Sequence, residues 1–219
     1  MASVTIYHDL ASTFSYPALE LLYNHPTFTS TPLHVVPIFL GGVFQTTGNK
    51  PPPMIPAKRE YLLLEFYRKC RKFSIPVRPE FPKKFPINSM NSQRAAVAVG
   101  LLYGEQEMSK VVREMGVAFW GKGEWNPEDK GDLEKVVAKI LGSAEKAKKV
   151  MEIIGGQEVK AKLTENTQDS VKKGAFGGPW MVVKTADGKE VVAWGVDALD
   201  VVAEAIGKEW PPRDVKASL

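Results

Sequence analysis

The rest of the chain can be interpreted as a scaffold for one stretch, Asp9-Leu10-Ala11-Ser12-Thr13-Phe14-Ser15-Tyr16-Pro17. It follows residues 4–7, whose apolar alternation predicts a buried first strand, and precedes residues 18–23, whose apolar spacing predicts a helix. Ser12 is therefore expected in a strand-to-helix turn. Unpaired backbone N–H groups and the helix dipole make such a turn a place to hold a thiolate or carboxylate. The alternative is that Ser12, Thr13 or Ser15 only caps the helix, because serine and threonine are preferred caps.

Composition indicates an ordinary globular protein. The 219 residues are 44% hydrophobic and 25% charged, which is enough to bury a full core as one domain or as one domain with an insertion. No run approaches the roughly 18 apolar residues that span a bilayer, and the first residues lack the pattern of a secretory signal. The net charge of +4 is small and spread along the chain. We therefore expect neither a nucleic-acid partner nor a membrane span.

Cysteine and histidine usage limits the chemistry further. The single cysteine, Cys70, excludes an intrachain disulfide, a Cys-x-x-Cys redox pair and a thiolate zinc cluster. Basic neighbours could lower the pKa of this thiol, but we expect a structural role for it. The three histidines, His8, His25 and His34, form no ligand pair at helical spacing, so we expect structural roles for them and no metal.

The order of the expected elements predicts an α/β protein. Residues 1–55 have the pattern of strand, helix, strand and loop, and residues 56–173 are almost entirely helical in pattern. From residue 174 onward the period returns to that of strands, around the hairpin turn Asp187-Gly188, and ends in a helix. This is the plan of a thioredoxin-like domain, residues 1–55 and 174–219, into which an all-helical domain, residues 56–173, is inserted.

Within this plan, residues 41–53 are rich in glycine, asparagine and proline. We expect them to form a surface loop, which could hold Asn49 or Lys50 over a ligand. Helical patterns cover residues 57–73 and continue along residues 92–119. Four aromatic residues either belong to the core or line an apolar pocket between the two domains: Phe39, Phe44, Phe119 and Trp120.

Six short motifs occur in the order seen in one enzyme family. They are Asp9-Leu10-Ala11-Ser12-Thr13-Phe14-Ser15-Tyr16, Gly48-Asn49-Lys50-Pro51-Pro52, Phe85-Pro86-Ile87-Asn88-Ser89, Arg94-Ala95-Ala96, Gly174-Ala175-Phe176-Gly177-Gly178-Pro179 and Gly195-Val196-Asp197. Over essentially the whole chain they resemble the kappa-class glutathione transferases and the related 2-hydroxychromene-2-carboxylate isomerases. The wider relatives, the DsbA-like disulfide oxidoreductases, carry Cys-x-x-Cys in the first turn. This chain has Ser12-Thr13-Phe14-Ser15 there, which excludes dithiol redox chemistry.

The resemblance implies a glutathione site built on the first turn. Ser12 matches the catalytic serine, whose hydroxyl hydrogen-bonds the glutathione sulfur, and Thr13 and Phe14 match turn positions beside the ligand. A free thiol has a pKa of about 8.5. This hydrogen bond and the helix terminus would together favour the thiolate at neutral pH. The thiolate would then attack a small electrophile or a peroxide.

The other implied glutathione-binding residues come from later segments. Asn49 matches a polar ligand contact, and Gly178 offers its backbone N–H and C=O to the cysteinyl part of glutathione. Pro179 matches the cis-proline of thioredoxin-like folds, although sequence alone favours a trans bond after two glycines. Asp197, preceded by Val196, matches the acidic residue that meets the γ-glutamyl amino group, and it also suits a helix cap.

Three positions depart from the family pattern. Gly178 stands where relatives usually carry a branched apolar residue, which removes one wall of the pocket. Val196 and Ala198 stand where relatives commonly carry serine or asparagine and then arginine, which predicts weaker capture of a carboxylate. Three functions stay open: a kappa-like glutathione transferase, a glutathione-dependent isomerase of a hydroxychromene carboxylate or similar compound, and a non-catalytic thioredoxin-like ligand-binding protein.

The resemblance also implies a homodimer, with glutathione as co-substrate and no metal. We expect an intracellular protein of the cytoplasm, mitochondria or peroxisomes. The last three residues, Ala217-Ser218-Leu219, resemble a peroxisomal tripeptide of the Ser-Lys-Leu type but lack its basic middle residue.

Overall fold

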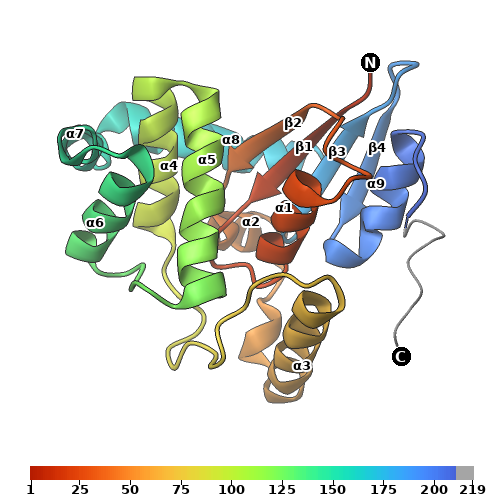
Figure 1. Cartoon of the computed structure of the whole chain (residues 1–219), viewed down its shortest axis with the longest axis horizontal. Helices are drawn as coiled ribbons and strands as arrows, with labels where there is room; N and C mark the ends of the chain where they lie inside the picture. The colour runs from red at the N-terminus through yellow and green to blue at the C-terminus, as the bar shows by residue number, and fades with distance from the viewer. Residues whose placement is uncertain (211–219) are drawn as a thin grey trace.

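One mixed sheet of four strands forms the centre of the computed structural model, which describes residues 1–210. The strands are β1 (Ser3–His8), β2 (Leu33–Pro37), β3 (Trp180–Lys184) and β4 (Glu190–Trp194). Their order across the sheet is β2-β1-β3-β4 (Figure 1). β1 runs parallel to β2 and antiparallel to β3, which forms the hairpin with β4. The predicted thioredoxin-like α/β fold is confirmed.

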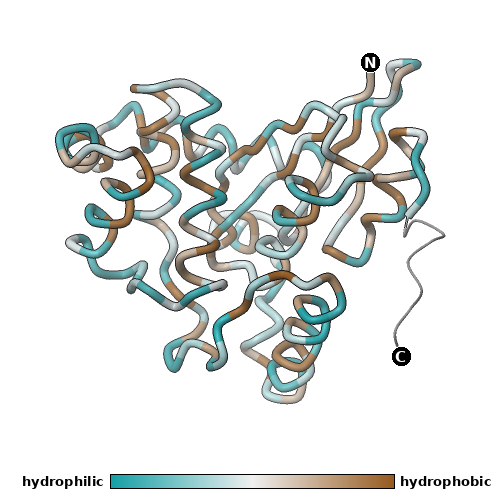
Figure 2. Tube along the Cα trace, in the orientation of Figure 1, coloured by the Kyte–Doolittle hydropathy of each residue, from teal (hydrophilic) through white to brown (hydrophobic). Residues whose placement is uncertain are grey.

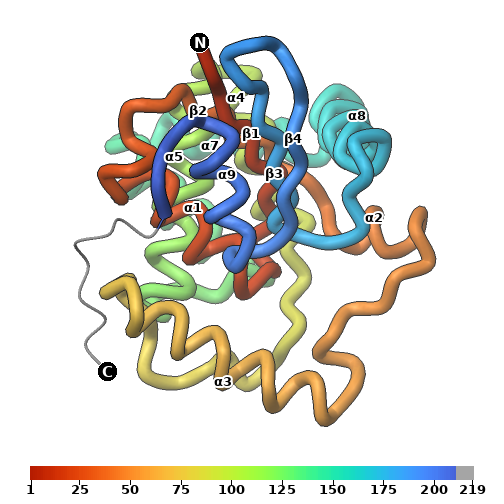
Figure 3. The backbone as a smooth tube through the Cα atoms, turned by 90° about the vertical axis from the view of Figure 1, so that its right-hand side faces the viewer, coloured from red at the N-terminus to blue at the C-terminus, as the bar shows by residue number. Residues whose placement is uncertain are grey.

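Helices cover both faces of this sheet. They are α1 (Ser15–Asn24), α2 (Leu40–Thr47), α3 (Pro56–Lys72), α4 (Met90–Tyr103), α5 (Glu105–Gly116), α6 (Lys130–Leu141), α7 (Ala144–Ile153), α8 (Gln157–Lys172) and α9 (Leu199–Ala205). Seen from the side, α1 and α9 lie on one side of the strands and α2 and α8 on the other (Figure 3). The helices α4 to α7 form a group beside β2 (Figure 1).

The alternation of side chains along the strands divides the core in two. Ile6 of β1, opposite Val35 and Met181, belongs to the larger cluster, which includes residues of α1 and α9. Tyr7, the next residue, belongs to a smaller cluster with Trp180, under α2. This follows because successive side chains of a strand point to opposite faces. Figure 2 shows hydrophobic residues along the central strands and hydrophilic residues on outer turns of the surrounding helices.

One local expectation was wrong, and one stretch of helical pattern is divided. Residues 40–47 form α2 where a loop was expected, and a left-handed glycine, Gly48 with φ of 72°, ends this helix before a 3-10 turn over Pro52–Met54. The stretch from 92 to 119 is two helices, because Gly104 has a φ of 90° and separates α4 from α5. Glycine reaches such positive φ values without the steric cost that other residues pay. A π-helix, Val117–Lys122, then follows α5.

The chain between β2 and β3 is helical apart from its connections. Its last helix, α8, packs against β2 and α2, and therefore helps to cover the sheet. The division of the chain into domains at 55/56 and 173/174 stays a prediction. None of the helices described in residues 1–210 is both long enough and apolar enough to cross a membrane. The tripeptide Ala217-Ser218-Leu219 lies outside the described residues.

Candidate active site

Ser12 lies in the tight turn between β1 and α1. Its N–H donates to the C=O of Asp9 at 3.0 Å, and its side chain is buried, with 8% exposed. The hydroxyl Oγ donates to the carbonyl oxygen of Gly178 at 3.0 Å and accepts the N–H of Ser15 at 3.1 Å. Through the second contact Ser12 accepts the first N–H of α1, although the residue directly before the helix is Phe14. The first contact joins this turn to a segment 166 residues away in the sequence.

Gly178 is followed by a cis peptide bond to Pro179, as the family resemblance implied and against the expectation from sequence alone. The segment that begins at Gly195 is hydrogen-bonded to this loop, because the N–H of Gly195 donates to the C=O of Pro179 at 3.0 Å. A Cβ atom at Gly178 would lie 3.1 Å from Cδ2 of Leu40. The leucine side chain therefore approaches the place that a side chain at position 178 would take.

Asn49 follows α2 and lies against the loop that precedes β3. Its side-chain Nδ2 donates to the C=O of Phe176 at 2.7 Å, and its Oδ1 accepts the N–H of Lys50 at 2.8 Å. This hydrogen bond holds Asn49 against the segment that contains Gly178, which is two residues after Phe176. Phe176 and Trp194, both exposed, lie with their ring centroids 4.7 Å apart on this surface.

Asp197 lies in the short 3-10 helix Val196–Ala198, which precedes α9. Its side chain is 70% exposed, and its Oδ1 pairs with the ammonium group of Lys69 from α3. Val196 is buried in the larger core, so its side chain does not face a ligand.

Thr13 and Phe14 complete the predicted set of site residues. Thr13 is buried, and Phe14 is the residue immediately before α1 and packs against the larger core. The structure thus links Ser12 to Gly178 and Pro179 to Gly195 through hydrogen bonds, and it brings Asn49 to the loop before β3. The side chain of Phe14 packs against the larger core, that of Val196 belongs to it, and Thr13 is buried; their roles toward a ligand stay predictions.

Buried polar groups next to the Ser12 turn hold its backbone through hydrogen bonds. The Asp9 carboxylate, fully buried, accepts the N–H of Ala11 at 2.9 Å and that of Leu40 at 2.7 Å. Burial raises the pKa of Asp9, and these two hydrogen bonds oppose that rise. Burial also lowers the pKa of His8 to about 3, so this histidine is neutral at physiological pH.

Gln93 of α4 is a site-building residue that the sequence did not reveal. Its Nε2 donates to the C=O of His8 at 2.7 Å and to that of Ile38 at 2.8 Å, and its Oε1 accepts the N–H of Leu10 at 3.3 Å. It therefore joins the ends of β1 and β2 just before the Ser12 turn. The only sequence signal was a polar residue among small apolar ones in a helical stretch.

Cys70 has the structural role that was expected of it. Cys70 is fully buried, and burial raises the pKa of its thiol to about 12, so its basic neighbours do not activate it. Trp120 is fully buried and donates its Nε1–H to the C=O of Leu10 at 2.8 Å, while Phe119 is buried beside it. These two aromatic residues are core residues, as one of the two interpretations held. Within residues 1–210, no three histidine, cysteine or acidic side chains gather as a metal site would require.

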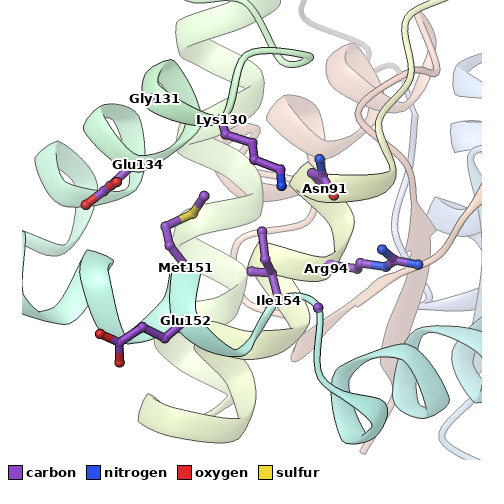
Figure 4. A pocket seen from close by; sticks show the side chains of 9 residues that line it. Asn91, Arg94, Lys130, Gly131, Glu134, Met151, Glu152 and Ile154 are labelled. Atoms are coloured by element: carbon purple, nitrogen blue, oxygen red, sulfur yellow. The ribbon is translucent and has the colours of Figure 1, made fainter.

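A cavity of about 450 Å³ lies away from the Ser12 turn, among α4, α6 and α7. Figure 4 shows its lining side chains, among them the basic Arg94 and Lys130 and the acidic Glu134 and Glu152. Both signs of charge are present, and none of the predicted site residues lines it. The candidate active site is therefore the surface around Ser12 and Gly178.

Known proteins resemble this chain over nearly its whole length. Residues 3–207 match the family described as a DSBA-like thioredoxin domain. The chain is 30% identical to glutathione S-transferase kappa 1 of Caenorhabditis elegans, over 96% of this chain and 93% of the relative. It is 29% identical to glutathione S-transferase kappa 1 of Homo sapiens, over 95% of this chain and 92% of that one. The solved structure of 2-hydroxychromene-2-carboxylate isomerase shares the fold, with a TM-score of 0.76 at 22% identity, over 93% of this chain and 94% of that one.

Proposed function

Because this chain belongs to the DSBA-like thioredoxin family, and within it to the kappa-class glutathione transferases, we propose that it binds glutathione and activates its thiol on Ser12. The thiolate then attacks a small electrophile or a peroxide. Glutathione is the co-substrate, and the protein supplies the site that ionises it. The homodimer implied by the family resemblance stays a prediction.

The observation that carries this proposal is the hydrogen bond from Ser12 Oγ to the C=O of Gly178. In the proposed complex this C=O accepts the N–H of the cysteinyl residue of glutathione instead. The hydroxyl of Ser12 is then free to donate to the sulfur of the same residue. Binding of the peptide backbone and activation of the thiol are therefore coupled through one exchange of hydrogen bonds.

The surroundings of Ser12 favour a thiolate at that place. The N–H of Ser15 donates to Ser12 Oγ, and this contact polarises the hydroxyl toward donating its own proton. The start of α1 adds the positive end of the helix dipole. A hydrogen bond to a charged group is worth about 1.5–3 kcal/mol, and each pKa unit corresponds to about 1.4 kcal/mol. Ser12 alone can thus lower the pKa of the bound thiol by about one to two units, and the proton leaves to solvent.

An exposed aromatic surface near this turn could bind an apolar electrophile. The exposed rings of Phe176 and Trp194 pack against each other, and Phe176 is two residues from Gly178. Aromatic faces of this kind bind planar apolar groups well. We assign the electrophile to this side of the site.

Two measurements on the purified protein test the proposal. Calorimetric titration with glutathione measures binding, and product analysis after addition of a model electrophile and of a hydroxychromene carboxylate identifies the reaction. A glutathione conjugate establishes a transferase, whereas a rearranged product with glutathione unchanged establishes the isomerase alternative. Binding without turnover on either substrate favours the ligand-binding alternative. No binding at millimolar glutathione refutes the proposal.

A further inference from the structure

An ion pair joins α3 to the segment that precedes α9. The ammonium of Lys69, near the end of α3, contacts Oδ1 of Asp197. The Lys69 side chain is 22% exposed and that of Asp197 is 70% exposed, so the lysine is mostly covered while the carboxylate faces solvent. The pair lies beside the candidate active site, because Gly195, two residues before Asp197, is hydrogen-bonded to Pro179.

The sequence lacks a cation at this place. Kappa-class relatives commonly carry arginine directly after the aspartate, and this chain has Ala198 there. Lys69 brings a positive charge to the same carboxylate from a different helix. The other basic residues in the last turn of α3, Arg71 and Lys72, are exposed and form no ion pair with Asp197 within residues 1–210.

The pair of opposite charges fits one end of glutathione. The γ-glutamyl end carries an ammonium and a carboxylate on the same carbon atom. A carboxylate has about four acceptor sites and an ammonium has three donors, so Asp197 and Lys69 can each keep their mutual contact and bind a further group. Two such charges side by side match a zwitterion better than either alone.

We propose that Lys69 is a specificity-determining residue that binds the α-carboxylate of the γ-glutamyl end, while Asp197 binds its ammonium. Lys69 thereby takes over the task of the cation that Ala198 does not supply. This inference rests on the proposed binding of glutathione. It explains how the site captures a carboxylate despite the departure at position 198.

The test compares Lys69→Met with Lys72→Met, a matched change of an exposed lysine on the same helix. Calorimetry measures the affinity of each variant and of the unaltered protein for three peptides. These are glutathione, glutaryl-cysteinyl-glycine, which lacks the ammonium, and 4-aminobutanoyl-cysteinyl-glycine, which lacks the α-carboxylate. Thermal unfolding checks that both variants are folded.

Lys69→Met is expected to weaken binding of glutathione and of the glutaryl peptide about 10-fold, as loss of a charged hydrogen bond does. Its affinity for the aminobutanoyl peptide should not fall, and Lys72→Met should change none of the three. An equal loss for all three peptides would overturn the proposal and show that Lys69 only holds α3 in place. Unchanged glutathione affinity in Lys69→Met would overturn it too. If the unaltered protein binds none of the peptides, the proposed function itself fails.

Discussion

Replacing Ser12 with alanine should raise the pKa of bound glutathione while leaving the protein folded. In the free protein the change removes the donor to Gly178, but Ser15 keeps a partner because its N–H also donates to the backbone C=O of Ser12 at 3.2 Å. The loss of one such hydrogen bond costs about 1 kcal/mol of unfolding free energy. In the complex the hydroxyl stabilises only the ionised sulfur, so its loss of about 1.5–3 kcal/mol raises the thiol pKa by about one to two units.

The assay is a pH titration of the ultraviolet absorbance of the thiolate, with glutathione saturating. Since the hydrogen bond favours the charged form, its removal must move the titration midpoint to higher pH. Ser15→Ala is the matched control, because Ser15 begins α1 directly after the same turn and its buried hydroxyl has no hydrogen-bond partner within residues 1–210. If Ser12→Ala titrates at the same pH as the unaltered protein, or if Ser15→Ala shifts the midpoint as much, the assignment of Ser12 as the activating donor is refuted.

Three further predictions concern residues that build the site. Gly178→Val should lower the unfolding free energy, measured by urea denaturation, by about 1–3 kcal/mol, because the new side chain would crowd Leu40 at the start of α2. An unchanged unfolding free energy would mean that Leu40 moves aside without cost. Gln93→Leu should lower the unfolding free energy by about 3 kcal/mol in the same assay, because it removes the partners of buried backbone groups. The control Gln106→Leu changes an exposed glutamine and should lower it little. Equal losses in the two variants would contradict the role given to Gln93. Folding lowers the pKa of His8 from 6.5 to about 3. Between these two pH values the histidine binds a proton only in the unfolded chain, so the free energy of unfolding decreases as pH falls through this range. His8→Gln should remove up to about 1.4 kcal/mol per pH unit of that slope. An unchanged slope in His8→Gln would show that His8 is protonated in the fold.

The departure at Val196 has a structural consequence beyond the loss of a hydroxyl. The valine side chain is buried in the larger core and therefore contributes to packing beneath α9. A polar side chain at this buried position would need a hydrogen-bond partner. The exposed side chain of this segment is that of Asp197, which pairs with Lys69.

The sequence determined the elements whose signals are local. The period of two along β1 and β3, the Asp187-Gly188 turn and the apolar spacing of α1 all depend on neighbours within a few residues, and all appear in the structure. The absence of a second cysteine likewise excluded dithiol chemistry without any coordinates. Ser12 could be placed in its strand-to-helix turn for the same reason.

The tertiary structure decided how distant segments meet. The hydrogen bond between Ser12 and Gly178, the three contacts of Gln93 and the pairing of Lys69 with Asp197 each join residues between 55 and 166 positions apart. No local period or propensity encodes such pairs, because a side chain gains its partner only when the packing of the core brings two backbones together. The cis bond before Pro179 belongs here as well, since sequence alone favoured a trans bond.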